Sequence, residues 1–393
     1  MKITSVDVIK LKRLAFSTQT PVLCRINTDE GIYGYGEAGV SIQDFSVGSY
    51  EILKLMSKPI LGMDPLEIDV IYSKLTSMFW SQGNGGVIMA AISAIDTALW
   101  DIKAKYFGVP LYKLLGGKHR DKLRTYASQL QNGWKYHDFI NAPGDLDFLR
   151  KACQDALADG YTAVKIDFTG KGLDGKRLSG DMQRNWLTPD VLNLFVERVR
   201  VARETLGPDV DIIMENHCNT SANTAIQFAR AAEKYNIMFL EEPCNPLSPI
   251  EHKKISENTT IPVATGERTY TRWGYLPILM NGSVSVIQPD LGNCGGVTEA
   301  RKICDLAQVF GVSVQTHTCN TPISVAVSLH LEAAIPNFII HEHHTVNTLP
   351  EVRELCVYDY QPENGYFSIP EIPGIGNELS EKALSEAVIE TIQ

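Results

Sequence analysis

The pattern of apolar positions changes from one period to another within the first 117 residues. Polar and apolar residues alternate over residues 3–10 and 22–27, and a polar turn separates the second run from a third at 32–39. Three antiparallel strands are therefore expected. Between residues 87 and 108 the apolar positions recur at spacings of three and four, which predicts a helix ending at Gly108. Together these elements predict a small α+β unit.

Beyond the Leu-Leu-Gly-Gly at residues 114–117, short β-type runs alternate with helical stretches. Strands that alternate with helices pair in parallel, and eight such units predict closure into a (β/α)8 TIM barrel. We expect a barrel catalytic domain over residues 118–354. An α+β N-terminal capping domain is expected over residues 1–117, completed by the C-terminal tail 355–393. The eight expected strands lie within 125–130, 162–168, 210–216, 237–243, 261–267, 284–290, 312–318 and 337–343.

Ionisable residues recur at the C-terminal ends of the expected barrel strands. From Glu215 onward they are separated by 26, 26, 23, 27 and 25 residues, about one strand and helix each. Residues at these strand ends should converge on one mouth of the barrel, where barrel enzymes hold their catalytic groups. The set consists of Lys165, Asp167, Glu215, His217, Glu241, Glu267, Asp290, His317 and Glu342.

Three of these residues, Glu215, Glu241 and Glu267, end successive strands. A site made of carboxylate oxygens suits a hard cation such as Mg²⁺ and offers nothing that would select zinc. Each glutamate alone is more simply explained as a surface residue in a salt bridge. Their regular spacing favours a shared metal site.

Two histidines flank the acidic cluster. His217 ends the third expected strand and His317 the seventh, so they should face each other across the mouth. A base and an acid on opposite faces are what an anti elimination needs. Asp290, on the strand next to His317, can accept the second imidazole proton and so select the tautomer.

Lys165 and Asp167 are two residues apart on one expected strand and so share a face. Both are predicted to bind substrate, with Lys165 pairing with a substrate carboxylate. A buried Lys165–Asp167 ion pair without a catalytic role is the alternative. The following segment, 168–190, is long and rich in glycine and charge. It is either a lid over the mouth or a plain surface insertion.

Composition narrows the class of partner. The net charge is −10 without a basic cluster, which argues against nucleic acid or an anionic membrane surface. No apolar run is long enough to span a bilayer. The eight cysteines are scattered without CxxC pairs, as expected for reduced thiols in the cytoplasm. A small soluble substrate is therefore predicted, and an anionic one would need a metal or a lysine to overcome the global charge.

Six sequence motifs stand in order along the chain: TDEGIYGYGE at 28–37, SAIDTALWDIKAK at 93–105, FLEEP at 239–243, IPVATGER at 261–268, IQPDLGNCGGVTEA at 287–300 and QTHT at 315–318. These motifs resemble the mandelate racemase subgroup of the enolase superfamily, and within it the acid-sugar dehydratases, most of all the galactonate dehydratases. The resemblance covers nearly the full chain.

This resemblance implies a Mg²⁺-dependent hydro-lyase that converts an aldonate, such as galactonate, or an aldarate into a 2-keto-3-deoxy acid. It implies metal ligation by the three glutamates and a base, the Asp290–His317 pair, that removes the C2 proton. His217 would protonate the departing 3-hydroxyl, and Glu342 would hydrogen-bond the enediolate oxygen. The resemblance also implies a symmetric homo-oligomer.

The chain departs from the subgroup at two positions. Racemases of this kind carry a second lysine where Asp167 stands, so two-base racemisation is disfavoured. Glu215 stands where aspartate is common, and the longer side chain shifts the expected metal position. An epimerase or racemase with His217 as the second base and a non-catalytic scaffold remain the alternatives. Substrate choice is expected to depend on the loops near 15–22 and 40–48, on 79–86 and on the loop after Phe168.

Overall fold

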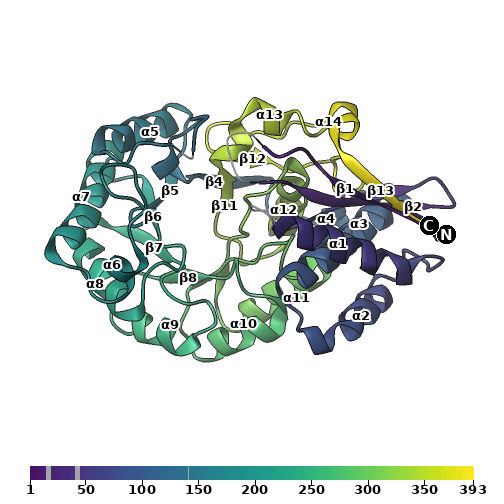
Figure 1. Ribbon diagram of the computed structural model, residues 1–393, viewed down its shortest axis with the longest axis horizontal. Coiled ribbons are helices and arrows are strands. Elements are labelled where there is room, and N and C mark those ends of the chain that lie inside the picture. The colour runs from purple at the N-terminus through teal and green to yellow at the C-terminus, as the bar shows by residue number, and fades with distance from the viewer. Residues whose placement is uncertain (15–18, 40–44, 140) are drawn as a thin grey trace.

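A computed structural model describes residues 1–14, 19–39, 45–139 and 141–393. A barrel and an antiparallel sheet lie side by side (Figure 1). The sheet has the order β13-β1-β2-β3, and its outer strand β13 comes from the C-terminal end of the chain. The two termini consequently lie next to each other (Figure 1). The strands are β1 (Ile3–Lys10), β2 (Val22–Thr28), β3 (Tyr33–Ala38) and β13 (Val388–Ile392).

The long helix α3 (Gly86–Tyr106) packs directly on β3. A Cβ atom at Gly36 would lie 1.9 Å from the carbonyl oxygen of Ala94, and one at Gly34 would lie 2.1 Å from that of Ala98. No side chain fits at such distances, so the two glycines allow the strand and the helix to touch. Two further helices, α1 (Phe45–Ser57) and α2 (Ile68–Met78), complete this unit.

All eight expected barrel strands are present, and the predicted TIM barrel with an α+β cap is confirmed. Neighbouring strands pair in parallel from β4 to β10, and β11 returns to pair with β4. Hydrogen bonds between Val314 and the segment 337–339 close the barrel. The strands are β4 (Lys122–Ser128), β5 (Ala163–Asp167), β6 (Asp211–Glu215), β7 (Ile237–Glu241), β8 (Val263–Thr265), β9 (Val286–Ile287), β10 (Ser313–Val314) and β11 (His341–His344).

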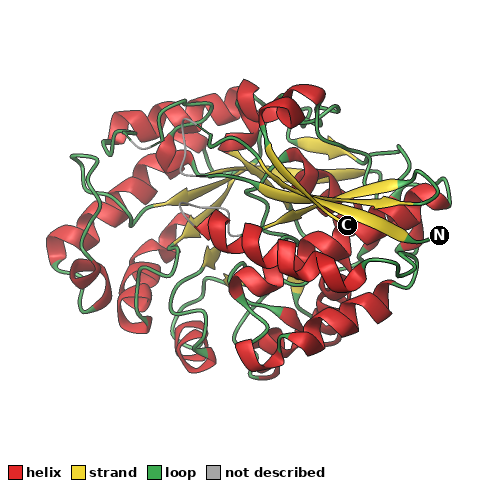
Figure 2. Ribbon diagram, turned by 45° about the vertical axis from the view of Figure 1, so that its right-hand side comes forward, coloured by secondary structure: helices red, strands yellow, loops and turns green. Residues whose placement is uncertain are grey.

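Helices surround the barrel strands (Figure 2). No helix in the described part of the chain is both long enough and apolar enough to cross a membrane. The larger helices are α5 (Leu146–Ala158), α7 (Pro189–Leu206), α8 (Ala222–Ala232), α9 (Pro249–Ser256), α10 (Thr271–Met280), α11 (Gly296–Val309) and α12 (Pro322–Ala334). Shorter elements are α4 (Leu111–Leu114), α6 (Gly180–Arg184), α13 (Pro350–Arg353), β12 (Tyr366–Ser368) and α14 (Glu381–Glu386).

Buried hydrogen bonds fix the cap to the barrel beside its mouth. Glu37 at the end of β3 accepts hydrogen bonds from Thr321 and Ser324 at the start of α12. Burial raises the pKa of Glu37 to about 7, although these hydrogen bonds oppose the shift. Asp96 of α3 accepts the backbone N–H of Thr298 in α11. Two separate barrel helices are thus joined to the cap.

Candidate active site

The register of the barrel strands brings the expected site residues to one level. Asp167 of β5 is paired with Glu215 of β6, and Glu215 is paired with Glu241 of β7. Residues two apart on a strand share a face, so Glu215 and Glu241 lie above the buried interior residues Ile213 and Phe239. The barrel is therefore apolar below and ionisable at its C-terminal mouth.

Glu215, Glu241 and Glu267 form the predicted acidic cluster. One carboxylate oxygen from each lies within 4.8 Å of the others. The Oε2 atoms of Glu215 and Glu241 are buried without a hydrogen-bond partner. Burial, and then the neighbouring Glu215, raise the pKa of Glu241 well above its ordinary value. Carboxylates held together in this way suit a divalent cation, which would supply the missing partner.

Lys165 is completely buried beneath this cluster. Its Nζ atom lies 2.5 Å from Glu241, 2.8 Å from Glu342 and 3.4 Å from Glu215. Among the described residues no ion pair joins Lys165 to Asp167, so the alternative of a Lys165–Asp167 pair is wrong.

Glu342 points inward from β11, as the sequence predicts. It accepts hydrogen bonds from Ser128 Oγ at 2.6 Å and from the backbone N–H of Thr318 at 2.9 Å. The adjacent His341 and His343 point the other way and pack against Phe367. The histidine-rich segment 341–344 therefore contributes a carboxylate to the mouth.

His317 lies beside Glu267 and is held by Asp290. Its Nδ1 atom is 2.7 Å from Asp290 Oδ2, and its Nε2 atom is 3.4 Å from Glu267 Oε2. Burial alone would lower the pKa of His317, but the neighbouring Cys319 and Glu267 raise it well above its usual value. The charge of His317 contributes in turn to lowering the pKa of Glu267 to about 2, although burial opposes this shift. The predicted Asp290–His317 contact is thus present.

His217 is held by Asp167 in the same way. The distance from His217 Nδ1 to Asp167 Oδ2 is 2.8 Å. The other oxygen, Asp167 Oδ1, accepts backbone N–H groups from Thr169 at 2.7 Å and Gly170 at 3.0 Å. Burial acts to raise the pKa of Asp167, but the hydrogen bond from His217 and those from Thr169 lower it overall. Both carboxylate oxygens are therefore occupied by the protein itself.

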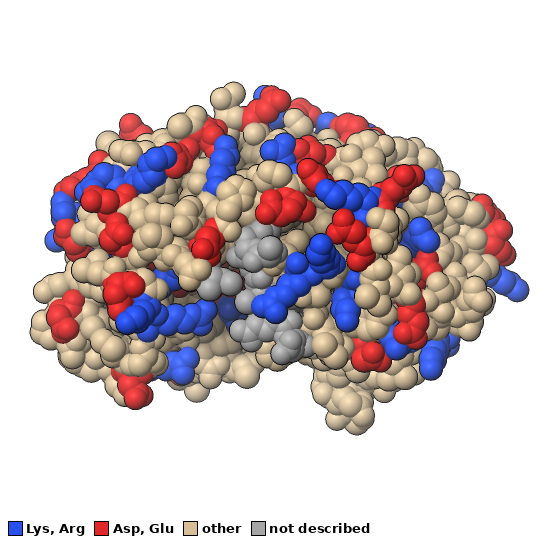
Figure 3. All heavy atoms as spheres, turned by 45° about the horizontal axis from the view of Figure 1, so that its top comes forward, with Lys and Arg blue, Asp and Glu red and all other residues tan. Residues whose placement is uncertain are grey.

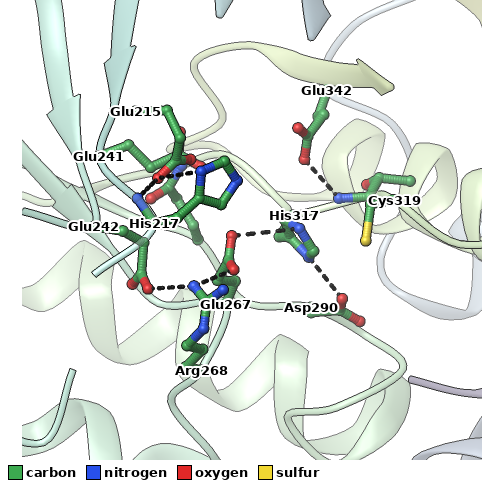
Figure 4. A network of polar contacts seen from close by, with 12 residues as sticks. Glu215, His217, Glu241, Glu242, Glu267, Arg268, Asp290, His317, Cys319 and Glu342 are labelled. Carbon is green, nitrogen blue, oxygen red and sulfur yellow. Dashed lines mark hydrogen bonds and ion pairs between the residues drawn. The ribbon is translucent and has the colours of Figure 1, made fainter. Parts of the chain in front are cut away.

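In Figure 4 the imidazole of His217 lies above and slightly to the left of the Glu267 carboxylate, and the imidazole of His317 lies to its right. His217 and Cys218 adopt left-handed backbone angles, with φ of 44° and 56°. Such angles are uncommon for residues with side chains and are costly unless the surroundings hold them. Here Glu215 Oε1 accepts the N–H of His217 at 2.6 Å, and the carbonyl of Glu242 accepts that of Cys218 at 2.8 Å.

Two functional side chains were not assigned from the sequence. Arg268 contacts both Glu267 and Glu242, with 2.6 Å to the Oε2 atom of Glu242 (Figure 4). Gln129, which follows β4, places its amide nitrogen 3.2 Å from Nε2 of His217. Both residues sit just past a strand end, so the rule that located the glutamates also marks them. Part of the loops predicted to select the substrate, residues 15–18 and 40–44, lies outside the described residues.

A barrel mouth with three clustered carboxylates between two histidines defines an enzyme of the enolase type. Residues 148–383 match the family described as Enolase C-terminal domain-like, and residues 3–116 match the mandelate racemase / muconate lactonizing enzyme N-terminal domain. The chain therefore belongs to the enolase superfamily, in the mandelate racemase and muconate lactonizing enzyme family. Membership implies the use of a divalent metal, consistent with the acidic cluster.

Similar proteins include named dehydratases. The D-xylonate dehydratase of Haloferax volcanii is 31% identical over 379 residues, which cover 94% of this chain and 85% of the relative. The D-galactonate dehydratase of Ralstonia pickettii is 31% identical over 385 residues, which cover 96% of this chain and 94% of the relative. A solved enolase superfamily member from Salmonella typhimurium is 46% identical with a TM-score of 0.95, and the match covers 100% of both chains. Because the dehydratases are hydro-lyases, the prediction of a lyase is confirmed.

Proposed function

We propose that this protein is a Mg²⁺-dependent dehydratase that converts a sugar acid into a 2-keto-3-deoxy acid. The observation that carries the proposal is the placement of two Asp-supported histidines on either side of the acidic cluster. A reaction that takes a proton from one carbon and gives a proton to the neighbouring hydroxyl needs two such groups. The substrate is an aldonate or an aldarate.

Glu215, Glu241 and Glu267 would hold the metal, since their carboxylate oxygens cluster and the Oε2 atoms of Glu215 and Glu241 have no hydrogen-bond partner. When bound, Mg²⁺ supplies positive charge that stabilises the enediolate form of the substrate carboxylate. Lys165, buried beside Glu241, would add a fixed positive charge near the substrate carboxylate. Glu342, held by Ser128 and Thr318, lies where it can hydrogen-bond an enediolate oxygen.

His317 would remove the proton from C2. With a metal cation bound at Glu267, the carboxylate charge that helps to raise the pKa of His317 would be offset, which favours the neutral ring. Asp290 accepts the Nδ1 proton of this ring, so the lone pair lies on Nε2, on the side of Glu267. The C2 proton passes to this nitrogen, and the electron pair of the C2–H bond enters the carboxylate to form the enediolate. Asp290 then stabilises the resulting imidazolium.

His217 would complete the elimination. As the electron pair returns from the enediolate, the C3–O bond breaks and the 3-hydroxyl leaves as water with a proton from His217 Nε2. The remaining enol tautomerises to the 2-keto-3-deoxy acid. The sequence predicts substrate binding for Asp167, but both oxygens of this carboxylate are occupied by His217 and the following loop. We therefore assign Asp167 to positioning His217.

A second candidate function is supported by the same pair. Because an aspartate supports His217 just as Asp290 supports His317, His217 could instead return a proton to the opposite face of C2. The product would then be an epimer formed without loss of water. We rank this below dehydration because named dehydratases match nearly the whole chain.

The test is a panel of aldonic and aldaric acids incubated with the protein and Mg²⁺, with the 2-keto-3-deoxy product measured. Dehydration that is lost on chelation and restored by Mg²⁺ is expected. Incorporation of deuterium from D₂O at C2, with inversion and without keto acid, would show that the reaction is epimerisation and not dehydration. If neither reaction occurs with any acid of the panel, both the dehydratase and the epimerase function are contradicted.

A further inference from the structure

A cavity of about 540 Å³ opens between His217 and the loop 168–190. This volume lies within the range of small-molecule sites. His217 and Gln129 line one part of the cavity, and Arg177 and Arg184 of the long loop line another. The loop after β5 therefore forms a wall of the same space that reaches the proposed acid.

The lining of this cavity is strongly cationic, although the whole chain has a net charge of −10. Figure 3 shows lysine and arginine side chains on both sides of the recess near the middle of the face, with acidic side chains also nearby. The only acidic side chains among the described lining residues are Asp145 and Asp167. Asp145 caps α5 by accepting the N–H of Phe148, and Asp167 is held by His217. The cationic lining residues are Lys171, Arg177, Arg184, Arg198 and Arg268.

Two of these cations already have partners. Arg198 is buried and donates to the backbone carbonyls of Gly144, Phe168, Lys171 and Gly172, so it holds the loop in shape. Arg268 contacts the carboxylates of Glu242 and Glu267. The guanidinium groups of these two residues are therefore occupied by the protein itself and have little capacity to bind a ligand.

The remaining three cations have capacity to bind an anion. Among the described residues, Arg177 and Arg184 form no ion pair with a carboxylate. Lys171 is half-buried, and its hydrogen-bond partners, Ala142 and Asn132, are uncharged. Burial and then the nearby Arg177 lower the pKa of Lys171, although Asp167 and Asp138 oppose the shift. Like charges held close together are unfavourable, and an anion placed between them would reduce the repulsion.

We propose that this cavity binds the far end of a substrate that carries a second anionic group. The proposal rests on the proposed function, which places the reacting carboxylate at the acidic cluster and the C3 hydroxyl at His217. The carbons beyond C3 would extend past the amides of Gln129 and Gln131 toward Lys171 and Arg177. The substrate is then a doubly charged sugar acid, with either a second carboxylate or a terminal phosphate, and not an aldonate with an uncharged end.

The first test compares three acids of the same configuration: an aldonate, its terminally oxidised aldarate and its terminally phosphorylated aldonate. The expected result is a kcat/KM at least about tenfold higher for one doubly charged acid, since a charge-assisted hydrogen bond is worth about 1.5–3 kcal/mol. Comparing the two charged acids identifies the terminal group. An equal or higher kcat/KM for the plain aldonate would overturn the proposal.

The second test removes the two arginines among these three cations one at a time, as Arg177→Gln and Arg184→Gln. KM for the doubly charged acid should rise about tenfold in at least one variant, with kcat changed less than about twofold. KM for the aldonate should not change. The control is Lys176→Gln, because the side chain of Lys176 is paired with Asp174 and does not line the cavity. Equal losses for all acids, or equal losses in the control, would overturn the proposal.

A binding measurement separates this proposal from the proposed function. Calorimetric titration of the three acids into the His317→Asn variant, with Mg²⁺ present, reports affinity without turnover. The cavity assignment is supported, even if no acid is dehydrated, when a doubly charged acid binds more tightly than the aldonate and this difference disappears once Arg177→Gln or Arg184→Gln is added to His317→Asn. Dehydration of an aldonate without such a preference would leave the function standing and overturn the cavity assignment.

Discussion

The two histidines of the mouth have nearly identical supports and different surroundings. Each Nδ1 atom contacts an aspartate, at 2.7 Å in the Asp290–His317 pair and 2.8 Å in the Asp167–His217 pair. The second oxygen of each aspartate accepts a backbone N–H two residues further along, also at 2.7 Å, from Gly292 and from Thr169.

The difference lies at the Nε2 atoms, which would exchange protons with the substrate. His317 is 12% exposed and faces the carboxylate of Glu267, whereas His217 is 27% exposed and faces Gln129 and the cavity. Under the proposed mechanism, similar supports hold a base and an acid, and the surroundings of the two Nε2 atoms distinguish the two roles. The predictions below test that division of roles.

The largest effect is expected for His317→Asn. Asparagine cannot take the C2 proton, so dehydration and deuterium exchange at C2 should both fall by about 10⁴-fold. Keto-acid formation and mass spectrometric deuterium content measure the two reactions. Exchange that persisted in this variant would assign proton removal to another residue.

A smaller and selective effect is expected for His217→Asn. Loss of the general acid should slow dehydration by about 10²-fold, while exchange at C2 remains within about fivefold of the wild type. Both rates come from one D₂O experiment, with the His317→Asn variant run alongside. If exchange fell as far as dehydration, His217 would be needed for proton removal as well, and the two rings would not have separate roles.

The supporting aspartates offer a matched pair of substitutions. Asp290→Asn and Asp167→Asn should each reduce dehydration by about 10- to 100-fold, because the tautomer and the orientation of the ring are no longer enforced. Only Asp290→Asn should reduce C2 exchange to the same extent. Equal exchange rates in the two variants would show that the supports act on the whole site together.

The smallest effect is expected for Gln129→Ala. One neutral hydrogen bond is worth about 1 kcal/mol, so dehydration should fall about two- to fivefold and C2 exchange should not change. Steady-state kinetics with the best acid of the panel measure this difference. A loss of exchange would mean that Gln129 contributes to binding and not only to the orientation of His217.

The fold and most of the site could be predicted because both follow from period and spacing. Strand ends in a parallel barrel meet at one edge, so the near-constant intervals from Glu215 to Glu342 located the acidic cluster and His317 with Asp290. The Asp167–His217 contact could not be found in this way. It joins two strands separated by the long loop 168–190, and nothing in the spacing distinguishes Lys165 from Asp167 as the partner of His217.

The cationic cavity was also missed, because its lining comes from irregular loops whose shape no periodicity describes. The sequence left the segment 168–190 as either a lid or a plain insertion. The structure shows that Arg198 holds this segment through backbone carbonyls, so its fold depends on a residue of α7 that carries no motif. Net charge was equally uninformative, since a value of −10 conceals a local excess of arginine.

The carboxylate of Asp167 has consequences for attempts to redesign this protein. One oxygen holds the proposed acid, and the other holds Thr169 and Gly170 near the start of the loop whose arginines line the cavity. A loop transplanted from a relative to change the preferred acid would therefore also disturb the ring of His217 unless its first turn kept the N–H groups of positions 169 and 170. Selectivity and turnover should prove difficult to evolve independently here, and libraries that begin at residue 171 should retain more active members than those that begin at 168.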